Sequence, residues 1–374
     1  MKVDVHLTKE EKDRYSRHLA LPDFTTEHQE KLKAARVLVV GAGGLGCPVL
    51  QYLCAAGVGT LGIVDGDKVS LSNLQRQILY QESDIGFSKV RVAADRLKKM
   101  NHLLAVEIFE NHLTRENALG ICTSYDLIVD CSDNFPTRYL VNDVCVLQQK
   151  PFVYGSVFRY EGQVSVFNYQ LGPTYRDLYP LPPAAGSVLS CAEGGVLGVL
   201  PGFIGCAQAM EAIKIITGIG EVLSGRLLIM DTQTMQADFI SIPNQNQRIN
   251  VTGLIDYEHF CNPIVTTKTM KEVTVQELKS LIDSKADFQL IDVREPHEYD
   301  ICNLQGELIP QAEIPHNVDK ISKDKKVIIH CRSGARSGNM VQWLEKNHGF
   351  TNLYNLKGGV LAWAKEIDPS MPTY

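Results

Sequence analysis

The feature that most constrains the fold is an apolar, β-branched run that ends in a cluster of glycines. Residues 36–40 (Arg-Val-Leu-Val-Val) predict a strand, and the glycines within residues 41–46 open into a helical pattern at 45–56. Glycine lets the backbone approach a phosphate closely, and the first N–H groups and the dipole of the following helix favour its negative charge. This stretch therefore predicts a phosphate-binding turn between a strand and a helix.

An acidic residue ends the next predicted strand. Residues 61–65 (Leu-Gly-Ile-Val-Asp) place Asp65 about 20 residues beyond the glycines, where a carboxylate usually accepts a ribose hydroxyl. The two features together predict a nucleotide above the first two strands of a Rossmann-like sheet. By themselves they also suit an NAD-dependent oxidoreductase, which stays open as an alternative.

Composition narrows the class of protein. A length of 374 residues suggests about two domains, and a hydrophobic share of 44% is ample for their cores. The net charge of -6 argues against general binding of nucleic acid. The first ten residues are mixed and polar, no apolar run reaches membrane-spanning length, and the ten cysteines are scattered. We therefore expect a cytoplasmic protein with no membrane and no nucleic-acid partner.

Strand and helix patterns alternate in the first part of the chain. Strands are predicted at 36–40, 61–65, 106–109 and 127–130, with helices at 45–56, 88–100 and 137–148. Such alternation predicts a parallel sheet covered by helices on both faces. Beyond residue 151 the pattern predicts strands at 152–157, 162–167, 226–230 and 238–242, a helix at 205–217 and a proline- and glycine-rich loop at 171–195.

A second, smaller α/β unit follows a polar, irregular segment. We place a linker at residues 246–270, which divides the chain into domains at 1–245 and 271–374. In the second domain, strands are predicted at 288–292 and 326–330 and helices at 335–347 and 360–366. The predicted fold class is therefore α/β for both domains.

Polar and charged residues follow the predicted strands of the first domain, at the edge where ligands bind in such sheets. They are Ser72, Asn73, Gln75 and Arg76, with Leu74 among them, after the second strand, Lys89 at the start of the next helix, and Asp133 and Asn134 after the fourth strand. Arg76 and Lys89 can neutralise phosphate oxygens, and Asp133 can hold Mg²⁺, which binds through one or two carboxylates plus phosphates. Together these residues predict an ATP site.

The segment from Arg14 to about Ile242 resembles the ThiF/MoeB family of adenylyltransferases, which are related to ubiquitin-activating enzymes. The matching motifs are Arg14–Arg17, Gly41–Gly46, Asp65–Asp67, Ser72–Gln77, Gly86–Val90, Asp130–Asn134 and Ser190–Gly195. The resemblance implies a Rossmann-like adenylation domain that uses ATP and Mg²⁺. Its substrate would be the C-terminal Gly-Gly carboxylate of a ubiquitin-fold sulfur-carrier protein, and its products an acyl adenylate and pyrophosphate.

The resemblance also implies roles for single residues. Asp65 would bind the ribose, Arg76 and Lys89 the phosphates, and Asp133 the metal, while Arg17 would enter the site of the other subunit in a homodimer. The full set implied to bind ATP is Gly41, Gly43, Gly44, Asp65, Asp67, Ser72, Asn73, Leu74, Gln75, Arg76, Lys89, Asp133 and Asn134.

Two cysteine positions bear on the chemistry of this domain. Cys191 stands where the family motif has its cysteine, so it is a candidate to attack the adenylate or to join a disulfide intermediate. Many relatives also bind a structural zinc through two Cys-x-x-Cys pairs. Here Thr174 and Asp177 stand at the first pair, and only Cys261 remains near the second. Because tetrahedral thiolate zinc needs four ligands, we predict no zinc.

In the second domain a cysteine loop joins a strand to a helix. The loop comprises Cys331, Arg332, Ser333, Gly334, Ala335 and Arg336. Its N–H groups can surround the sulfur, and the helix dipole and the two arginines favour a thiolate there. A phosphatase-type loop uses the same physics and is the competitor, but this loop is one residue shorter between Cys331 and Arg336 than such loops usually are.

Residues 271–363 resemble a rhodanese domain. The matching pieces are Leu290–Tyr299, the Cys331 loop and Leu356–Trp363, whereas the stretch Cys302–Pro310 departs from the usual pattern. The resemblance implies that Cys331 carries a persulfide. Both halves then serve one reaction, in which the carrier carboxylate is activated and converted to a thiocarboxylate with sulfur from a persulfide donor such as a cysteine desulfurase.

The main hypothesis is therefore an adenylyltransferase and sulfurtransferase. One alternative is an NAD-dependent oxidoreductase with a regulatory rhodanese domain, and another is a scaffold with a decayed site that binds carrier proteins. Molybdopterin, thiamine thiazole, cysteine and tRNA-thiolation pathways all use such carriers, so the pathway stays open.

Overall fold

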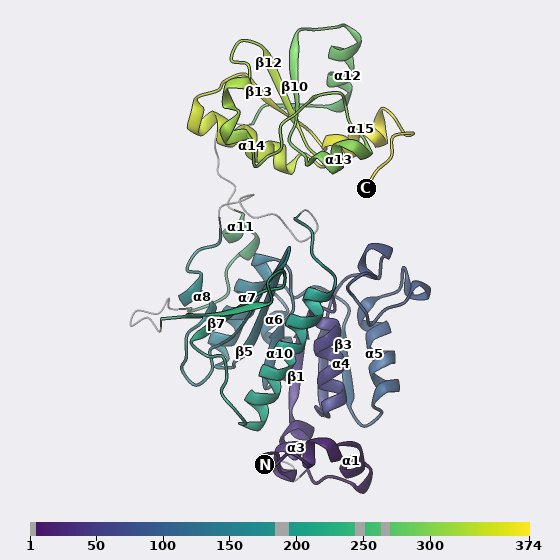
Figure 1. Ribbon diagram of the computed structural model, residues 1–374, viewed down its shortest axis with the longest axis vertical. Helices are drawn as coiled ribbons and strands as arrows, with labels where there is room; N and C mark the ends of the chain where they lie inside the picture. The colour runs from purple at the N-terminus through teal and green to yellow at the C-terminus, as the bar shows by residue number, and fades with distance from the viewer. Residues whose placement is uncertain (1–4, 184–193, 244–250, 263–269) are drawn as a thin grey trace. The chain divides into compact units, whose positions relative to one another are not determined.

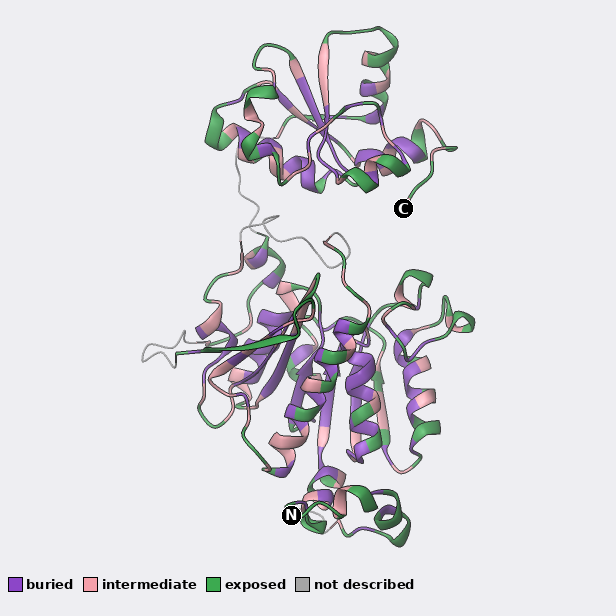
Figure 2. Ribbon diagram, in the orientation of Figure 1, coloured by how far each residue is buried: buried purple, intermediate pink, exposed green. Residues whose placement is uncertain are grey.

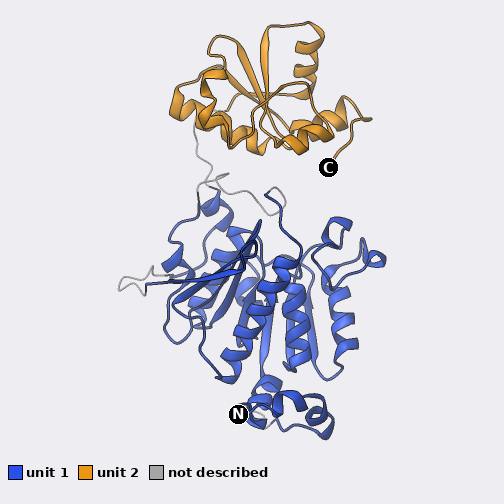
Figure 3. Ribbon diagram, viewed as in Figure 1, with its two compact units in different colours: residues 1–183, 189–262 blue, residues 184–188, 263–374 orange. Residues whose placement is uncertain are grey.

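The computed structural model describes residues 5–183, 194–243, 251–262 and 270–374. They form two compact units, one that ends at residue 262 and one from residue 270 onward (Figure 1; Figure 3). Each unit has its own sheet and its own hydrophobic clusters. Each is described below by itself.

The first unit is built on an eight-stranded sheet with the order β3-β2-β1-β4-β5-β6-β7-β8. Its strands are β1 Arg36–Val40, β2 Thr60–Val64, β3 Ala105–Phe109, β4 Leu127–Asp130, β5 Phe152–Phe158, β6 Glu161–Phe167, β7 Arg226–Asp231 and β8 Gln236–Ser241. The strands from β3 to β5 pair in parallel, whereas β6, β7 and β8 pair antiparallel. The predicted Rossmann-like α/β class is confirmed, with an antiparallel extension that completes a mixed sheet.

Helices cover both faces of this sheet. They are α1 Lys9–Arg14, α2 Ser16–Leu19, α3 Thr26–Ala34, α4 Gly46–Ala56, α5 Lys89–Met100, α6 Ala118–Thr123, α7 Phe135–Leu147, α8 Tyr175–Leu178, α10 Val199–Thr217 and α11 Tyr257–Cys261. Val37 and Val39 of β1 belong to the cluster with α4, α5 and α10, while Leu38 and Val40 belong to the cluster with α6 and α7. Alternate residues of one strand thus support two layers of helices, as expected for a buried parallel strand.

The helix α10 is longer than predicted and apolar enough to cross a membrane by length and composition alone. This overturns the expectation that no apolar run reaches that length. The helix lies against α4, β5 and β6 in the first unit, and its residues Leu200, Ile204 and Ala212 are fully buried there (Figure 1). Burial in the core explains its composition, because a helix that packs on a sheet and on a second helix needs a wide apolar surface.

The end of the first unit lies beyond the predicted boundary at residue 245. The helix α11 falls inside the predicted linker 246–270, yet it packs against α7, and its residues Tyr257 and Cys261 are buried. The polar, irregular sequence around α11 hides this short helix, since five residues give too little periodicity to predict one.

The second unit has a five-stranded parallel sheet with the order β11-β10-β12-β13-β9. Its elements are β9 Glu272–Val273, α12 Val275–Asp283, β10 Phe288–Asp292, α13 Pro296–Ile301, β11 Glu307–Leu308, β12 Lys326–His330, α14 Ala335–His348, β13 Leu353–Leu356 and α15 Gly359–Glu366. The central strands are buried along most of their length (Figure 2). The predicted small α/β domain is confirmed.

Candidate active sites

The glycine turn after β1 has a backbone that only glycine adopts easily. Gly41 has a φ of 94°, and a Cβ there would lie 2.8 Å from the carbonyl oxygen of Cys131. The turn leads directly into α4, which begins at Gly46 without a side-chain cap. The N–H groups of Cys47 and Val49 already donate to the carbonyl oxygens of Gly43 and Leu45, so α4 favours an anion here chiefly through its N-terminal dipole.

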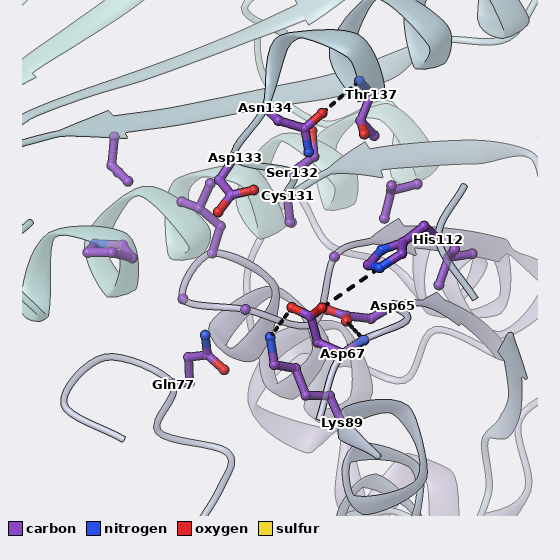
Figure 4. Close-up of a pocket in the computed structure, with 18 of the residues that line it drawn as sticks. Asp65, Asp67, Gln77, Lys89, His112, Cys131, Ser132, Asp133, Asn134 and Thr137 are labelled. Carbon is purple, nitrogen blue, oxygen red and sulfur yellow. Dashed lines mark hydrogen bonds and ion pairs between the residues drawn. The ribbon is translucent and has the colours of Figure 1, made fainter. Parts of the chain in front are cut away.

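A pocket opens at the carboxyl ends of β1, β2 and β4 (Figure 4). Of the thirteen residues predicted to bind ATP, those that line it are Gly41, Gly43, Gly44, Asp65, Asp67, Arg76, Lys89, Asp133 and Asn134. This set combines an open helix N-terminus with two basic and three acidic side chains. Such an arrangement can hold a nucleoside triphosphate, because the basic groups balance its charge and a carboxylate can share a divalent cation with it.

Asp65 ties the glycine turn to the second strand. One carboxylate oxygen accepts the N–H of Ala42 at 2.8 Å, and the other accepts the N–H of Asp67 at 2.8 Å. Each oxygen has a second lone pair, so the carboxylate can still accept ribose hydroxyls. Asp65 thus holds the turn in shape and lies in the pocket at the same time.

Lys89 is buried with its charge already paired. Its Nζ donates to Asp67 Oδ2 at 2.8 Å, and its side chain is 6% exposed. His112 Nε2 lies 3.8 Å from the other oxygen of Asp67 (Figure 4). Asp67 is therefore the counterion of Lys89 in the structure, rather than a group turned only toward a ligand.

The turn Ser72–Gln75 supports Arg76 from outside the pocket. The guanidinium of Arg76 donates to the carbonyl oxygen of Ser72 at 2.9 Å, and Asn73 Oδ1 accepts the N–H of Ser70 at 3.2 Å. Ser72, Asn73, Leu74 and Gln75 are absent from the described lining residues, although they are predicted to bind ATP. In this structure they shape the backbone that carries Arg76.

Asp133 and Asn134 lie at the start of α7. Asn134 Oδ1 accepts the N–H of Thr137 at 2.9 Å, so this side chain caps the helix. Asp133 is exposed on the pocket wall (Figure 4). Among the described residues no group of three or more His, Cys, Asp or Glu side chains could hold a metal ion. Asp133 would therefore hold Mg²⁺ together with phosphate oxygens, which fits the usual coordination of this ion.

In the second unit Cys331 lies at the N-terminus of α14. Its sulfur is fully buried, accepts the N–H of Gly334 at 3.2 Å and lies 3.4 Å from Ser337 Oγ. Gly334 has a φ of 91°, which lets the chain turn into the helix. Ser337, which was not among the predicted loop residues, also donates to Asn355 Oδ1 at 2.6 Å. The helix dipole and the N–H group favour a thiolate at this place.

The two arginines of the loop have other partners than the sulfur. Arg336 forms a bidentate pair with Glu298, with both distances 2.7 Å, and Arg332 Nε donates to the carbonyl oxygen of Tyr374 at 2.7 Å. Burial would raise the pKa of Glu298, but hydrogen bonds, the Arg336 bond above all, lower it to about 2. The charge of Arg336 is thus balanced by Glu298, whereas Arg332 bonds to a neutral carbonyl oxygen and keeps its charge.

Comparison with known proteins decides the family. Residues 15–251 match the ThiF family, and residues 274–366 match the rhodanese-like domain. The chain belongs to the ThiF family. It is 46% identical to the probable adenylyltransferase/sulfurtransferase MoeZ of Mycobacterium tuberculosis (strain ATCC 25618 / H37Rv), over 98% of this chain and 96% of that protein.

Further relatives carry the same two activities in their names. The adenylyltransferase and sulfurtransferase MOCS3 of Drosophila yakuba is 42% identical over all of this chain and 87% of its own length, and that of Danio rerio is 39% identical over all of this chain and 90% of its own. A crystal structure of E. coli MccB with MccA-N7isoASN has a TM-score of 0.57 and 20% identity, over 64% of this chain and 73% of that chain. At that identity it supports the fold alone.

Three polar residues of the ThiF pocket were missed by sequence reasoning as ligand contacts. Gln77 and Ser132 are 4% and 8% exposed, and neither Gln77 Oε1 nor Ser132 Oγ has a hydrogen-bond partner among the described residues. His112 lines the same pocket. A buried polar atom without a partner costs about 1–3 kcal/mol, so these atoms indicate a polar ligand. Gln77 lies in the motif Ser72–Gln77 and Ser132 in the motif Asp130–Asn134. Their places in these motifs could have identified both residues from the sequence.

Arg17 lies far from the pocket of its own ThiF domain. It is exposed on α2, two residues after Tyr15, which accepts a hydrogen bond from Asn101 beyond the end of α5 and packs against Gly57 at the end of α4. The pocket lies at the start of α4, and a helix of this length spans about 16 Å. Arg17 therefore does not line the nucleotide pocket of its own chain.

Cys191, the other predicted catalytic cysteine, lies outside the described residues. Described residues a few positions later, Val196 and Pro201, line the nucleotide pocket. Thr174 and Asp177, two of the positions on which the prediction of no zinc rests, bond to each other, with Thr174 Oγ1 donating to Asp177 Oδ2 at 2.9 Å. The remaining predicted position, Cys261, is buried beside α7.

Proposed function

We propose that this chain activates the C-terminal Gly-Gly carboxylate of a ubiquitin-fold sulfur-carrier protein with ATP and then converts it to a thiocarboxylate. The chain is an adenylyltransferase and sulfurtransferase of the ThiF family. The observation that carries the proposal is the pairing, in one chain, of a nucleotide pocket with a cysteine loop. Neither family description names an oxidoreductase, so the NAD-dependent alternative is not supported.

In the adenylation step the pocket acts by position and charge. A carboxylate oxygen of the carrier attacks the α-phosphorus of ATP, the bond from that phosphorus to the bridging oxygen breaks, and pyrophosphate leaves with the electron pair. Lys89 and Arg76 face the phosphates and balance the charge that moves to pyrophosphate. Mg²⁺, held by Asp133 and phosphate oxygens, would supply further positive charge. AMP is then a far better leaving group than the oxide of a free carboxylate.

In the sulfur step Cys331 acts as the first acceptor. Its thiolate attacks the outer sulfur of a donor such as thiosulfate or a desulfurase persulfide, the donor S–S bond breaks, and sulfite or the donor thiolate leaves with the electron pair. The N–H group of Gly334 and the α14 N-terminus stabilise the anionic sulfur before and after transfer. The outer sulfur of the Cys331 persulfide then attacks the acyl carbon, either of the adenylate, from which AMP leaves, or of a thioester with Cys191, from which the Cys191 thiolate leaves. In both routes the Cys191 thiolate cleaves the resulting acyl disulfide, which releases the thiocarboxylate and leaves a disulfide between Cys191 and Cys331 that an external thiol reduces.

The proposal includes a cytoplasmic homodimer in which Arg17 reaches the partner subunit's pocket. Its support is the position of Arg17 at the opposite end of α4 from the pocket of the same chain. Most soluble oligomers are symmetric dimers, and two-fold symmetry would complete both sites at once. We also propose a cysteine desulfurase as the persulfide donor and the absence of zinc.

The test is pyrophosphate exchange into ATP by the purified full chain. We expect exchange only in the presence of a carrier that ends in Gly-Gly, and none with the same carrier lacking its last glycine. Exchange without carrier, or reduction of a nicotinamide cofactor, would contradict the proposal, and absence of ATP turnover with every carrier would favour a scaffold. Co-purification of the endogenous carrier and its mass would decide among the molybdopterin, thiamine, cysteine and tRNA-thiolation pathways.

A further inference from the structure

The segment from α15 to Tyr374 contacts the cysteine loop that contains Cys331. At the start of α15, the N–H groups of Val360 and Leu361 donate to the carbonyl oxygens of Cys331 and Arg332, both at 3.0 Å. At the other end of the same segment, Tyr374 contacts the side chain of Arg332. Residues 359–374 thus contact the loop at two places: the backbone of Cys331 and Arg332, and the side chain of Arg332.

The hydroxyl of Tyr374 joins the buried charges beside the loop. It donates to Glu298 Oε1 at 2.8 Å and accepts from Arg294 Nη1 at 2.8 Å. Glu298 in turn holds Arg336, the last residue of the loop. Burial raises the pKa of Tyr374 to about 12, so the hydroxyl keeps its proton at neutral pH and can donate to the carboxylate.

The backbone and ring of Tyr374 hold Arg332. The Tyr374 carbonyl oxygen accepts from Nε of Arg332 at 2.7 Å and from Nη2 of the same guanidinium. The guanidinium carbon lies 5.3 Å from the centre of the Tyr374 ring, which is within range of a cation–π contact. Arg332 is otherwise an exposed side chain, so these contacts select one of its many conformations.

We propose that Tyr374 is a positioning residue of the sulfurtransferase site, which holds Arg332 at the mouth of the loop to meet an anionic sulfur donor. The proposal rests on the proposed sulfurtransferase function of Cys331. The contacts use Nε and Nη2 of Arg332, so the guanidinium can still offer Nη1 to a donor such as thiosulfate. A cation held in place binds an anion more tightly than a mobile one, because its conformational entropy is already lost.

The test compares Tyr374→Ala and Tyr374→Phe in the full chain with Tyr299→Phe as a matched control. Tyr299 lies on α13 with Glu298, but its hydroxyl donates to the carbonyl oxygen of Gly306 at 3.1 Å. One measurement is KM and kcat for sulfur transfer from thiosulfate to cyanide. The other is the alkylation rate of Cys331 by anionic iodoacetate relative to neutral iodoacetamide, with Cys331→Ser as the background.

Tyr374→Ala removes the ring contact with Arg332 and the hydroxyl bonds that hold residue 374 in place, which loosens the main-chain contact to Arg332 as well. It should raise KM for thiosulfate and lower the iodoacetate-to-iodoacetamide ratio by about three- to tenfold. Its kcat should change less than KM. Tyr374→Phe, which keeps the ring and loses the hydroxyl bridge, should give a smaller change in the same direction, and Tyr299→Phe should match the unmodified chain.

Unchanged KM and alkylation ratio in both variants would overturn the proposal. So would an equal loss of both alkylation rates, which is the sign of a purely structural role, or a faster reaction, which is the sign of a cover over the site. The alkylation ratio tests Tyr374 even if thiosulfate proves to be no donor. Failure of Cys331 to accept sulfur from any donor would instead count against the proposed function.

Discussion

At the scale of single residues, the pair formed by Lys89 and Asp67 sets the charge at the centre of the nucleotide pocket. The ammonium is buried, and only the carboxylate beside it makes that burial tolerable before ATP binds. Phosphate oxygens can take over part of this role when the nucleotide arrives. Both residues line the pocket, but Lys89 supplies positive charge for the phosphates, whereas Asp67 balances the charge of Lys89.

Lys89→Met should lower kcat/KM for carrier-dependent pyrophosphate exchange by about 100- to 1000-fold, because a charge aimed at the phosphates is lost. Asp67→Asn should lower it by only about tenfold, since the lysine charge remains. Steady-state exchange rates at several ATP concentrations measure both. Lys98→Met, an exposed lysine on the same helix, is the control and should match the unmodified chain. An Asp67→Asn defect as large as that of Lys89→Met would show that Asp67 contacts the nucleotide directly.

His330 precedes Cys331 and is fully buried, with no hydrogen-bond partner for either ring nitrogen among the described residues. Burial lowers the pKa of His330 to about 4, whereas an unfolded histidine has a pKa of about 6.5. As the pH falls below about 6.5, the unfolded chain binds a proton that the folded chain does not bind. The second unit should therefore be fully stable above that pH and lose stability as the pH falls to about 4.

Urea unfolding followed by tryptophan fluorescence measures this effect, because both tryptophans of the chain, Trp343 and Trp363, lie in the second unit. His330→Leu should flatten the loss between pH 6.5 and 4, and the exposed His297→Gln should leave it unchanged. An equally steep loss in His330→Leu would mean that another group controls the acid sensitivity.

At the scale of elements, a buried ion pair joins three helices of the first unit. Asp143 on α7 accepts two hydrogen bonds from Arg176 on α8, at 2.7 and 2.8 Å, and one from the Tyr257 hydroxyl on α11 at 2.8 Å. The guanidinium carbon of Arg176 lies 4.9 Å from the ring centre of Phe260, also on α11. These side-chain contacts attach α11 to α7 and α8.

Asp143→Asn should destabilise the first unit by about 3–5 kcal/mol, because it leaves a buried guanidinium uncompensated, and Tyr257→Phe by about 1 kcal/mol. Thermal unfolding with and without a chelator measures this, with the exposed Tyr160→Phe as control. We expect no effect of the chelator and no zinc by metal analysis. One tightly bound zinc per chain would contradict this prediction and would require ligands outside those named here.

At the scale of the whole molecule, two units serve one reaction, and the position of Arg17 predicts that two chains share each nucleotide site. Arg17→Ala and Lys89→Ala proteins should each be nearly inactive in pyrophosphate exchange. After subunit exchange, the mixture should recover about one quarter of full activity, because half of the dimers are mixed and each mixed dimer has one intact site. Lack of recovery with proven mixed dimers, or a fully active monomer, would contradict composite sites.

If the first unit adenylates the carrier and the second unit supplies sulfur, each activity should be lost separately in a suitable variant. Cys331→Ala should keep carrier-dependent pyrophosphate exchange and lose thiocarboxylate formation, since adenylation needs the carboxylate and ATP but no thiol. Cys191→Ala should also keep exchange, and Cys331 should still take up one sulfur, visible by intact mass. Loss of adenylation in a folded Cys331→Ala protein, or absence of persulfide on Cys331 in the Cys191→Ala protein, would contradict the assigned order.

Local chemistry was enough to predict the strands of the first unit and, in the second unit, the strands β10 and β12. The strand at residues 36–40, the glycine turn after it and the loop from Cys331 to Arg336 depend on neighbouring residues, through β-branched side chains, positive φ angles and helix N-termini. Gly41, Lys89 and Asp65 were found because such motifs hold their residues at short, regular spacings.

Only the tertiary structure decided which side chains meet across long separations. Lys89 pairs with Asp67 across 22 positions, and Arg332 meets Tyr374 across 42. The helix α11 reached the first unit because Tyr257 bonds to Asp143, 114 positions away. Pairings of this kind depend on how packed elements bring distant residues together, and neither periodicity nor motif spacing carries that information. For the same reason sequence reasoning did not find that Arg336 pairs with Glu298 or that Arg332 bonds to Tyr374.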